Sequence, residues 1–315
     1  MTRAFITGAT GQDGTYLTQH LHAQGYEVHG LVRPGDPPPM EPELITVHSG
    51  DLTDRPAMTA LLDEIQPGQI YNLGGLSSVA FCWTEPVLAA EVNGTGAVFL
   101  LEAAWKLQEK TGEKVSFVQA SSAEIFGEAD MAPQNESTPL RPVNPYGASK
   151  ALAHLSAGVY RARGLHASSV ILYNHESPLR PPSFVTRKIT QGAAAIAKGE
   201  ATELRLGNLD ARRDWGWAPD YVAAMVLAAT HADPDDYVIG TGEVHTVRDF
   251  AAAAFAAAGV ADWDKYVVED PAFYRPVDPT LLVADATRAN NVLGWRPTVS
   301  FDQLVSRMVA VDLDA

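Results

Sequence analysis

The chain opens with Phe5-Ile6-Thr7-Gly8-Ala9-Thr10-Gly11-Gln12-Asp13-Gly14, a short apolar run followed by a loop with three evenly spaced glycines. Such glycines permit a tight turn and a close approach of the backbone to a phosphate. The residues after the loop have a helical pattern, and the start of a helix offers free N–H groups to an anion. The order strand, glycine loop, helix predicts a dinucleotide site, and no Gly-Lys-Ser/Thr follows that would indicate a P-loop. The residues predicted to contact the cofactor here are Gly8, Thr10, Gly11, Gln12, Asp13 and Gly14.

Short runs rich in β-forming residues alternate with helical patterns from this loop to Tyr173. The predicted strands are 4–7, 26–32, 44–48, 69–73, 115–119 and 167–173, and the predicted helices are 15–24, 54–65, 86–110 and 146–163. Asp54 is the expected N-cap of its helix, with Pro56 just inside. This alternation predicts parallel strands joined by helical crossovers. We expect an α/β fold, a Rossmann-type doubly wound parallel sheet with a smaller C-terminal lobe.

The domain boundary is expected near residue 173, because proline-rich loops and shorter helices replace the alternation there. Residues 1–173 would form the dinucleotide-binding domain. Residues 174–315 would mainly bind substrate, with some segments returning to the first domain. The alanine-rich stretch 251–258 is read as a buried helix face.

Composition limits the partners of the chain. The 315 residues contain 23 Lys and Arg against 38 Asp and Glu, so the formal net charge is −15. That charge argues against nucleic acid and anionic membranes, which it would repel. The single cysteine, Cys82, excludes an intrachain disulfide and a cysteine-rich zinc site, and it suits a reducing compartment. The first residues lack a signal-peptide core and no run reaches the ~20 apolar residues of a membrane span, so we expect a cytoplasmic protein without a bound metal.

Arg33 favours NADP over NAD as the dinucleotide. The second predicted strand ends Leu31-Val32-Arg33, where an acidic residue would be typical of a site for the 2′-hydroxyl of NAD. A guanidinium there suits a 2′-phosphate, although an exposed loop arginine is the plain alternative. Asp51 follows the third strand and could meet the adenine amino group.

Tyr146 and Lys150 lie one helical turn apart in Tyr146-Gly-Ala-Ser-Lys150. This spacing often arises by chance, but its position after the fifth strand favours a catalytic pair. Lys150 would lower the pKa of Tyr146, which could then deprotonate a substrate hydroxyl while hydride leaves the same carbon. Ser122, at the end of the fifth strand, could share that hydroxyl. Glu124 could remove an acidic C–H beside the resulting ketone, or it could be a capping or surface acid.

These residues together resemble the extended short-chain dehydrogenase/reductase superfamily, and later segments narrow the resemblance to the GDP-mannose 4,6-dehydratase family. The segments that carry it are 174–178 (Asn-His-Glu-Ser-Pro), 184–190, 206–216 and 293–297, together with 10–17, 50–54 and 70–74. The resemblance implies a sugar-nucleotide-binding lobe and an internal redox cycle. Tyr146, helped by Lys150 and Ser122, would deprotonate the C4 hydroxyl as hydride moves to NADP⁺. Glu124 would take the C5 proton as the C6 hydroxyl leaves as water, and hydride would return to C6.

The same resemblance implies the remaining site residues. Further cofactor contacts would come from Arg33, Asp51, Leu52, Leu73, Tyr146 and Lys150. Contacts to the sugar nucleotide would come from Ser77, Asn174, Glu176, Val185, Lys188, Leu206, Gly207, Arg213, Arg275 and Asp278.

The chain departs from the family pattern at several places. Ser122-Ala123-Glu124 replaces the usual Thr-Ser-Glu, and Leu76-Ser-Ser-Val79 replaces Gln-Ser-His-Val. Pro34 replaces a second arginine, in a shorter proline-rich loop that builds tetramers in the family. A homodimer is therefore expected rather than a tetramer.

Other functions remain open. An epimerase of the same superfamily would not need Glu124, and a decarboxylase would need a further base for the uronate carboxylate. A dehydratase for another nucleotide sugar would keep all four catalytic residues. A non-catalytic dinucleotide sensor would be expected to lose Tyr146 or Lys150, and both are present.

A local excess of bases lies within residues 180–213. Its members are Arg180, Arg187, Lys188, Lys198, Arg205, Arg212 and Arg213, against Glu200, Glu203 and Asp210. Some of these bases are expected to neutralise a diphosphate. Cys82, Trp215 and Trp217 are expected to pack rather than react or stack on a ligand.

Overall fold

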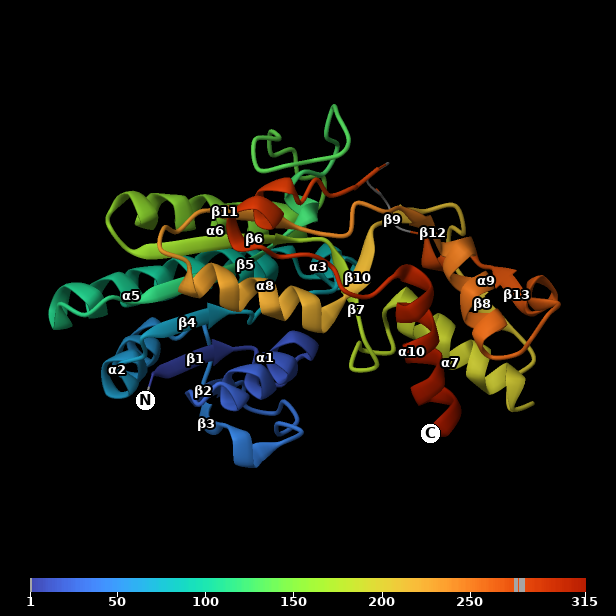
Figure 1. Cartoon of the computed structure of the whole chain (residues 1–315), viewed down its shortest axis with the longest axis horizontal. Coiled ribbons are helices and arrows are strands. Elements are labelled where there is room, and N and C mark those ends of the chain that lie inside the picture. Colours follow the sequence, from blue (N-terminus) through green and yellow to red (C-terminus); the bar gives the residue numbers. More distant parts are fainter. Residues whose placement is uncertain (1, 275–276, 278–280) are drawn as a thin grey trace.

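Seven parallel strands form the centre of the computed structural model, which describes residues 2–274, 277 and 281–315 (Figure 1). Their order across the sheet is β3-β2-β1-β4-β5-β6-β11, and every neighbouring pair is parallel. The bounds are β1 (Arg3–Thr7), β2 (Glu27–Val32), β3 (Thr46–Ser49), β4 (Gln69–Asn72), β5 (Ser116–Ser122), β6 (His166–Leu172) and β11 (Asp236–Ile239). The predicted doubly wound sheet is confirmed, and the strand order reverses between β1 and β4, where ligands bind in such folds.

Helices cover both faces of this sheet, each over its own apolar core. One core joins α1 (Gln12–Ala23) and α8 (Ala218–Thr230) to the sheet, and the other joins α2 (Arg55–Ile65), α5 (Gly96–Thr111) and α6 (Pro145–Ala162). Asp54 caps α2 as predicted, because its carboxylate accepts the Ala57 N–H at 3.0 Å.

The helical stretch Pro86–Thr111 consists of α4 (Pro86–Ala89), a π-helical segment η2 (Ala90–Thr95) and α5. By length and composition alone, it is the one helix among the described residues that could cross a membrane. Its Leu100, Leu101 and Leu107 are buried in the core with α2 and α6. We therefore read it as a core helix.

The smaller C-terminal lobe has a third core, between α7 (Val185–Ala197), α9 (Val247–Ala257) and α10 (Phe301–Asp314). Three two-stranded sheets frame it: β7 (Asn174–Glu176) with β10 (Trp215–Trp217), β8 (Leu204–Leu206) with β13 (Val267–Glu269), and β9 (Arg212–Arg213) with β12 (His245–Thr246). Trp215 is buried in this core and Trp217 packs against it, as predicted. Of the alanine-rich stretch, Ala251 and Ala254 are buried but Ala256 and Ala257 are exposed, so only one side of it faces the core.

The chain crosses back from this lobe to the large sheet. β11 forms the edge of the sheet and α8 covers one face, and both come after residue 217. The remaining short helices are α3 (Val79–Thr84), η1 (Pro42–Leu44), η3 (Ala123–Ile125), η4 (Trp263–Tyr266), η5 (Pro271–Phe273) and η6 (Ala289–Leu293). The carboxyl ends of β1, β4, β5 and β6 share one edge of the sheet, where the predicted site residues gather.

Candidate active site

The glycine loop packs tightly between β1 and the end of β4. Gly8 has φ +70°, and a Cβ on it would lie 2.9 Å from the Cα of Gly74. A Cβ on Gly14 would lie 2.3 Å from the Gly8 carbonyl oxygen, so neither position admits a side chain. Helix α1 begins after Gly11, and no side chain caps its first turn. The free N–H groups of that turn and the bare loop before it fit the pyrophosphate of a dinucleotide.

Strand β7 anchors the glycine loop through side chains. The His175 Nε2 lies 2.8 Å from the Asp13 Oδ2, the Gln12 amide donates to the His175 carbonyl at 3.1 Å, and Ser177 donates to Gln12 at 2.8 Å. The side chains of Gln12 and Asp13, which were predicted to contact the cofactor, are thus directed to β7 and the residue after it. Sequence reasoning missed this connection between segments 162 residues apart.

In the Asp13–His175 pair, His175 is buried and Asp13 is half-buried, and each side chain favours the charged form of the other. Burial opposes ionisation of Asp13, but His175 and Arg180 outweigh it, and the pKa of Asp13 is lowered. Burial likewise opposes the charged form of His175, but the Asp13 carboxylate outweighs it and raises the pKa of His175. The His175 ring also stacks on Tyr221 with centroids 4.7 Å apart. The glycine loop is therefore fixed by an ion pair as well as by close packing.

Arg33 follows β2, as predicted, but its guanidinium is paired with Asp36. The Arg33 Nη2 donates to the Asp36 Oδ1 at 2.8 Å across a turn in which Gly35 has φ +92°. Asp51 accepts the N–H and the hydroxyl of Thr53, and these bonds lower its pKa. Leu52 is buried in the core and Leu73 is half-buried after β4.

Four predicted catalytic residues meet where β5 ends and α6 begins. The Ser122 hydroxyl accepts the Glu124 N–H at 3.2 Å and also hydrogen-bonds Tyr146. The Lys150 Nζ donates to the Ala120 carbonyl at 2.9 Å and lies 5.8 Å from the centroid of the Tyr146 ring. A hydroxyl, a phenol, an ammonium and a carboxylate therefore share one small volume.

Burial dominates the electrostatics of the Tyr146–Lys150 pair. Burial raises the pKa of Tyr146 to about 12; Glu124 adds to this rise, and the Ser122 hydrogen bond and Arg180 oppose it. Burial also lowers the pKa of Lys150 to about 8. Lys150 is not among the main causes of the Tyr146 shift, and its ammonium donates to the Ala120 carbonyl, so a lowering of the Tyr146 pKa by Lys150 stays a prediction.

Two further residues at this site were missed. Asn144 is the N-cap of α6 and contacts Glu124; the sequence Asn144-Pro145 before a helical pattern is the signal that could have found it. Arg180 acts on the charges of both Asp13 and Tyr146, but it was noted only as one base among seven. Cys82 is buried as expected, and burial raises its pKa.

The predicted substrate residues fall into two groups. Lys188, Leu206 and Gly207 surround η5: the Lys188 Nζ lies 3.6 Å from the centroid of the Phe273 ring, and a Cβ on Gly207 would lie 2.8 Å from the Phe273 carbonyl. On β7, Glu176 is buried and accepts the Thr186 hydroxyl at 2.6 Å, beside Asn174.

The other predicted substrate residues are dispersed. Arg213 is buried on β9 and donates to the Arg212 carbonyl at 2.6 Å, Val185 packs against the lobe core, and Ser77 is exposed after β4. Arg275 and Asp278 lie outside the described residues.

Within the described residues, three of the seven bases in the local excess form ion pairs with acids. Arg187 is buried against Asp312, Arg205 contacts Glu203 and Asp270, and Arg180 lies 3.2 Å from Glu176. The expectation that the excess as a whole serves a diphosphate therefore does not hold for Arg187, which ties α7 to α10.

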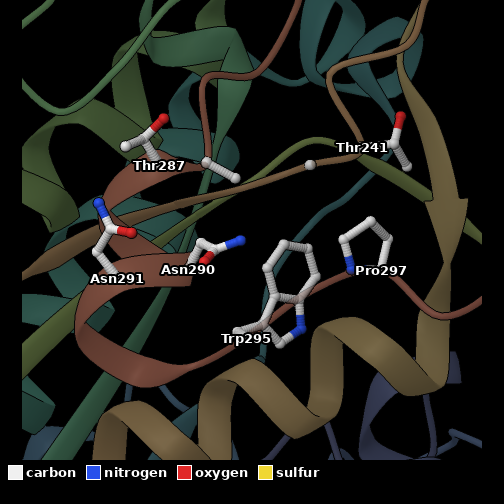
Figure 2. Close-up of a pocket in the computed structure, with 8 residues that line it drawn as sticks. Thr241, Thr287, Asn290, Asn291, Trp295 and Pro297 are labelled. Atoms are coloured by element: carbon white, nitrogen blue, oxygen red, sulfur yellow. The ribbon is translucent and has the colours of Figure 1, made fainter.

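A separate pocket of about 330 Å³ lies beyond the end of β11 (Figure 2). Its lining residues are Gly240, Thr241, Ala286, Thr287, Asn290, Asn291, Trp295 and Pro297. None of them is a predicted site residue. Across the described ranges, no three His, Cys, Asp or Glu side chains are placed to hold a metal ion.

Comparison with known proteins agrees with this geometry. The sequence pattern of the family described as GDP-mannose 4,6 dehydratase matches residues 5–308. The chain is 45% identical to GDP-mannose 4,6 dehydratase 2 of Arabidopsis thaliana over 99% of this chain and 87% of that one. It is 40% identical to the human GDP-mannose 4,6 dehydratase over 99% and 91%. The fold matches the Thermus thermophilus UDP-glucose 4-epimerase solved with NAD, with a TM-score of 0.87, 29% identity and full coverage of both chains.

Proposed function

This chain belongs to the GDP-mannose 4,6-dehydratase family, and on that premise we propose that it converts GDP-mannose to the GDP-4-keto-6-deoxy sugar with loss of one water. The observation that carries the proposal is Glu124 beside Ser122, Tyr146 and Lys150 at one strand end. Alcohol oxidation needs only the last three, whereas elimination needs a further base.

Each of the four residues has a distinct role in the proposal. A nicotinamide dinucleotide held at the glycine loop would supply the hydride acceptor for C4 and the hydride donor for C6. Tyr146, acting as its phenolate, takes the proton of the C4 hydroxyl while Ser122 holds that oxygen. Lys150, with a pKa of about 8, keeps its positive charge at neutral pH. Glu124 removes the C5 proton, and the C6 hydroxyl leaves as water once the C4 ketone makes C5 acidic.

The test is incubation with GDP-mannose in D₂O without added dinucleotide, followed by mass spectrometry. We expect a product that has lost one water and carries deuterium at C5. An unchanged mass with the cofactor bound would overturn the substrate assignment. UDP-glucose and dTDP-glucose, run in parallel, test a dehydratase for another nucleotide sugar. Conversion of either sugar to an isomer of unchanged mass, separated by chromatography, would instead indicate an epimerase.

We propose NADP as the preferred form of the nicotinamide dinucleotide. The support is Arg33 at the end of β2, where a guanidinium can meet a 2′-phosphate. Asp36 already pairs with that guanidinium, so a 2′-phosphate has to compete with it. The test is to load the protein from an equimolar mixture of NAD⁺ and NADP⁺ and to measure the bound ratio by mass spectrometry.

We propose that two copies associate through one apolar surface, here called the α3–α6 patch. Its members are Phe81, Trp83, Val87, Leu88, Leu152, Leu155 and Val159, all large apolar side chains that are more than a third exposed. On α6, residues 152, 155 and 159 follow the spacing of one helix face. A surface of this kind is typical of an interface between copies rather than of a monomer.

We also propose that the two domains expected from the sequence have separate binding functions. Residues 1–173 bind the dinucleotide, and residues 174–315 mainly bind the sugar nucleotide, with β11 and α8 serving the first unit. A buried free thiol at Cys82 and the absence of any other cysteine support a reducing, cytoplasmic setting.

A further inference from the structure

Asn144 joins two parts of the site with the two ends of one side chain. Its Oδ1 accepts the Gly147 N–H at 2.8 Å and so caps α6, the helix that carries Tyr146 and Lys150. Its Nδ2 donates to the Glu124 Oε2, also at 2.8 Å. Asn144 is buried and Glu124 is half-buried, so the bond to Gly147 is shielded from water and the bond to Glu124 partly so.

The backbone around these groups fixes their separation. A Cβ on Gly147 would lie 2.4 Å from the Glu124 carbonyl oxygen, so glycine allows the first turn of α6 to pack directly against Glu124. The Glu124 N–H is held by Ser122 at 3.2 Å. The main chain of Glu124 is thus fixed on two sides, whereas its side chain has several rotatable bonds. The Asn144 amide restricts those torsions.

The Nδ2 end of Asn144 is a donor only, and the Glu124 carboxylate oxygen is an acceptor. Contact with Nδ2 therefore holds the Glu124 carboxylate in one place. The cap and the carboxylate contact require opposite ends of the amide, so they also fix its orientation.

We propose that Asn144 is a positioning residue for Glu124, which keeps the carboxylate in place for removal of the C5 proton; this inference rests on the proposed dehydratase function. It acts on elimination and not on the oxidation at C4, because its contact is with Glu124. The C5–H bond breaks as its proton goes to the Glu124 carboxylate, and its electron pair forms the C5=C6 double bond. The C6–O bond breaks with its own electron pair, and the proton now on Glu124 goes to the departing hydroxyl, which leaves as water.

Three substitutions separate this role from capping. Asn144→Ser and Asn144→Asp both keep an oxygen that can cap α6, since Ser, Asp and Asn are comparable N-caps. Asn144→Ser keeps a hydroxyl but loses the longer amide arm that contacts Glu124, whereas ionised Asp has no donor and adds a second negative charge beside it. Asn144→Ala loses the cap as well. We expect the Ser and Asp proteins to melt close to the wild-type temperature and the Ala protein to melt lower.

The kinetic readout is single turnover with GDP-mannose, following reduced nicotinamide by absorbance and water loss by mass. In Asn144→Ser we expect C4 oxidation and KM close to wild type, while elimination and uptake of deuterium at C5 slow by about 10- to 100-fold, so reduced nicotinamide accumulates. Asn144→Asp should be slower still. Wild-type elimination in either variant overturns the proposal, as does equal loss of oxidation and elimination in a stably folded Asn144→Ser.

Failure of the proposed dehydratase function can be distinguished from failure of the role proposed for Asn144. If the wild-type protein with bound dinucleotide does not dehydrate GDP-mannose, both the function and the role of Asn144 are refuted. If the wild-type protein does dehydrate GDP-mannose and Asn144→Ser does so equally well, only the role of Asn144 is refuted. Thr84→Ser, an exposed change on α3 that keeps a hydroxyl able to donate to the Phe81 carbonyl, serves as the control and should match wild type in every measurement.

Discussion

Replacing Glu124 with glutamine isolates the proton-transfer chemistry from the geometry of the site. Glutamine has nearly the same shape, and its carbonyl oxygen can still accept the Asn144 Nδ2, which lies 2.8 Å from the carboxylate. The bond from the Glu124 N–H to Ser122 belongs to the backbone and is unaffected. Glu124→Gln therefore removes a base without removing a contact. We expect it to fold and bind nucleotides as the wild type does.

The expected size of the effect follows from the role of Glu124 as a general base. A positioned general base contributes about 10²- to 10⁴-fold, which corresponds to roughly 3–5 kcal/mol in the barrier. Water loss should slow by that factor, while Ser122, Tyr146 and Lys150 still oxidise C4. Reduced nicotinamide should therefore accumulate after mixing with GDP-mannose, and the sugar should take up no deuterium at C5 in D₂O.

The assay is single turnover with absorbance and mass read on the same samples. Glu128→Gln, the same change four residues along at an exposed position, is the matched control and should behave as wild type. The reasoning is refuted if Glu124→Gln yields dehydrated, deuterium-labelled product at more than a tenth of the wild-type rate. It is also refuted if oxidation at C4 is lost to the same extent as elimination.

Three other changes test separate parts of the structure. Asp36→Asn should raise the ratio of bound NADP to bound NAD about two- to five-fold, since an exposed ion pair is weak, and an unchanged ratio in the competition assay would contradict this. His175→Gln should lower stability by about 2 kcal/mol near pH 5.5, measured by denaturant titration. The pKa of His175 is raised and that of Asp13 lowered, so the pair stabilises most between the two values, and the loss should shrink as pH rises through the raised pKa of His175. Leu155→Lys should give monomers in sedimentation analysis, whereas Val292→Lys, at another exposed apolar site outside the α3–α6 patch, should not. A dimer that survives Leu155→Lys would exclude the patch.

The sheet and the glycine loop could be predicted because their signals are local. Apolar runs of four to seven residues, glycines at 8, 11 and 14, and the cap at Asp54 each act within a few residues. The return of β11 to the sheet could be expected only in outline. A short buried strand after a long helical lobe carries no mark of the sheet edge it will join.

The parts that could not be predicted depend on pairs distant in the chain. Arg187 has the sequence context of an anion-binding base, but its partner, Asp312, is 125 residues away and buried with it. A count of charged residues along the sequence cannot distinguish an arginine that is paired inside the protein from one that is available to bind an anion. The Asp13–His175 pair could not be predicted for the same reason. Each of the two segments was assigned to a ligand separately, whereas in the structure their side chains bond to each other.

The departure from the family pattern at Ala123 finds its explanation in the packing of the strand end. Ala123 is 4% exposed and belongs to the apolar core under α8, so its side chain points away from the reacting groups. A serine hydroxyl there would need a partner within that core to offset its burial. Ser122, in contrast, faces the site, where its hydroxyl meets the Glu124 N–H and the Tyr146 phenol. The residue that must keep an oxygen is therefore Ser122, and the loss of the middle hydroxyl leaves the bonding of Glu124 and Tyr146 intact. Ser122 is the last residue of β5 and Ala123 the first of η3, so the residue at 123 can change with the core while the hydroxyl at 122 stays at the site.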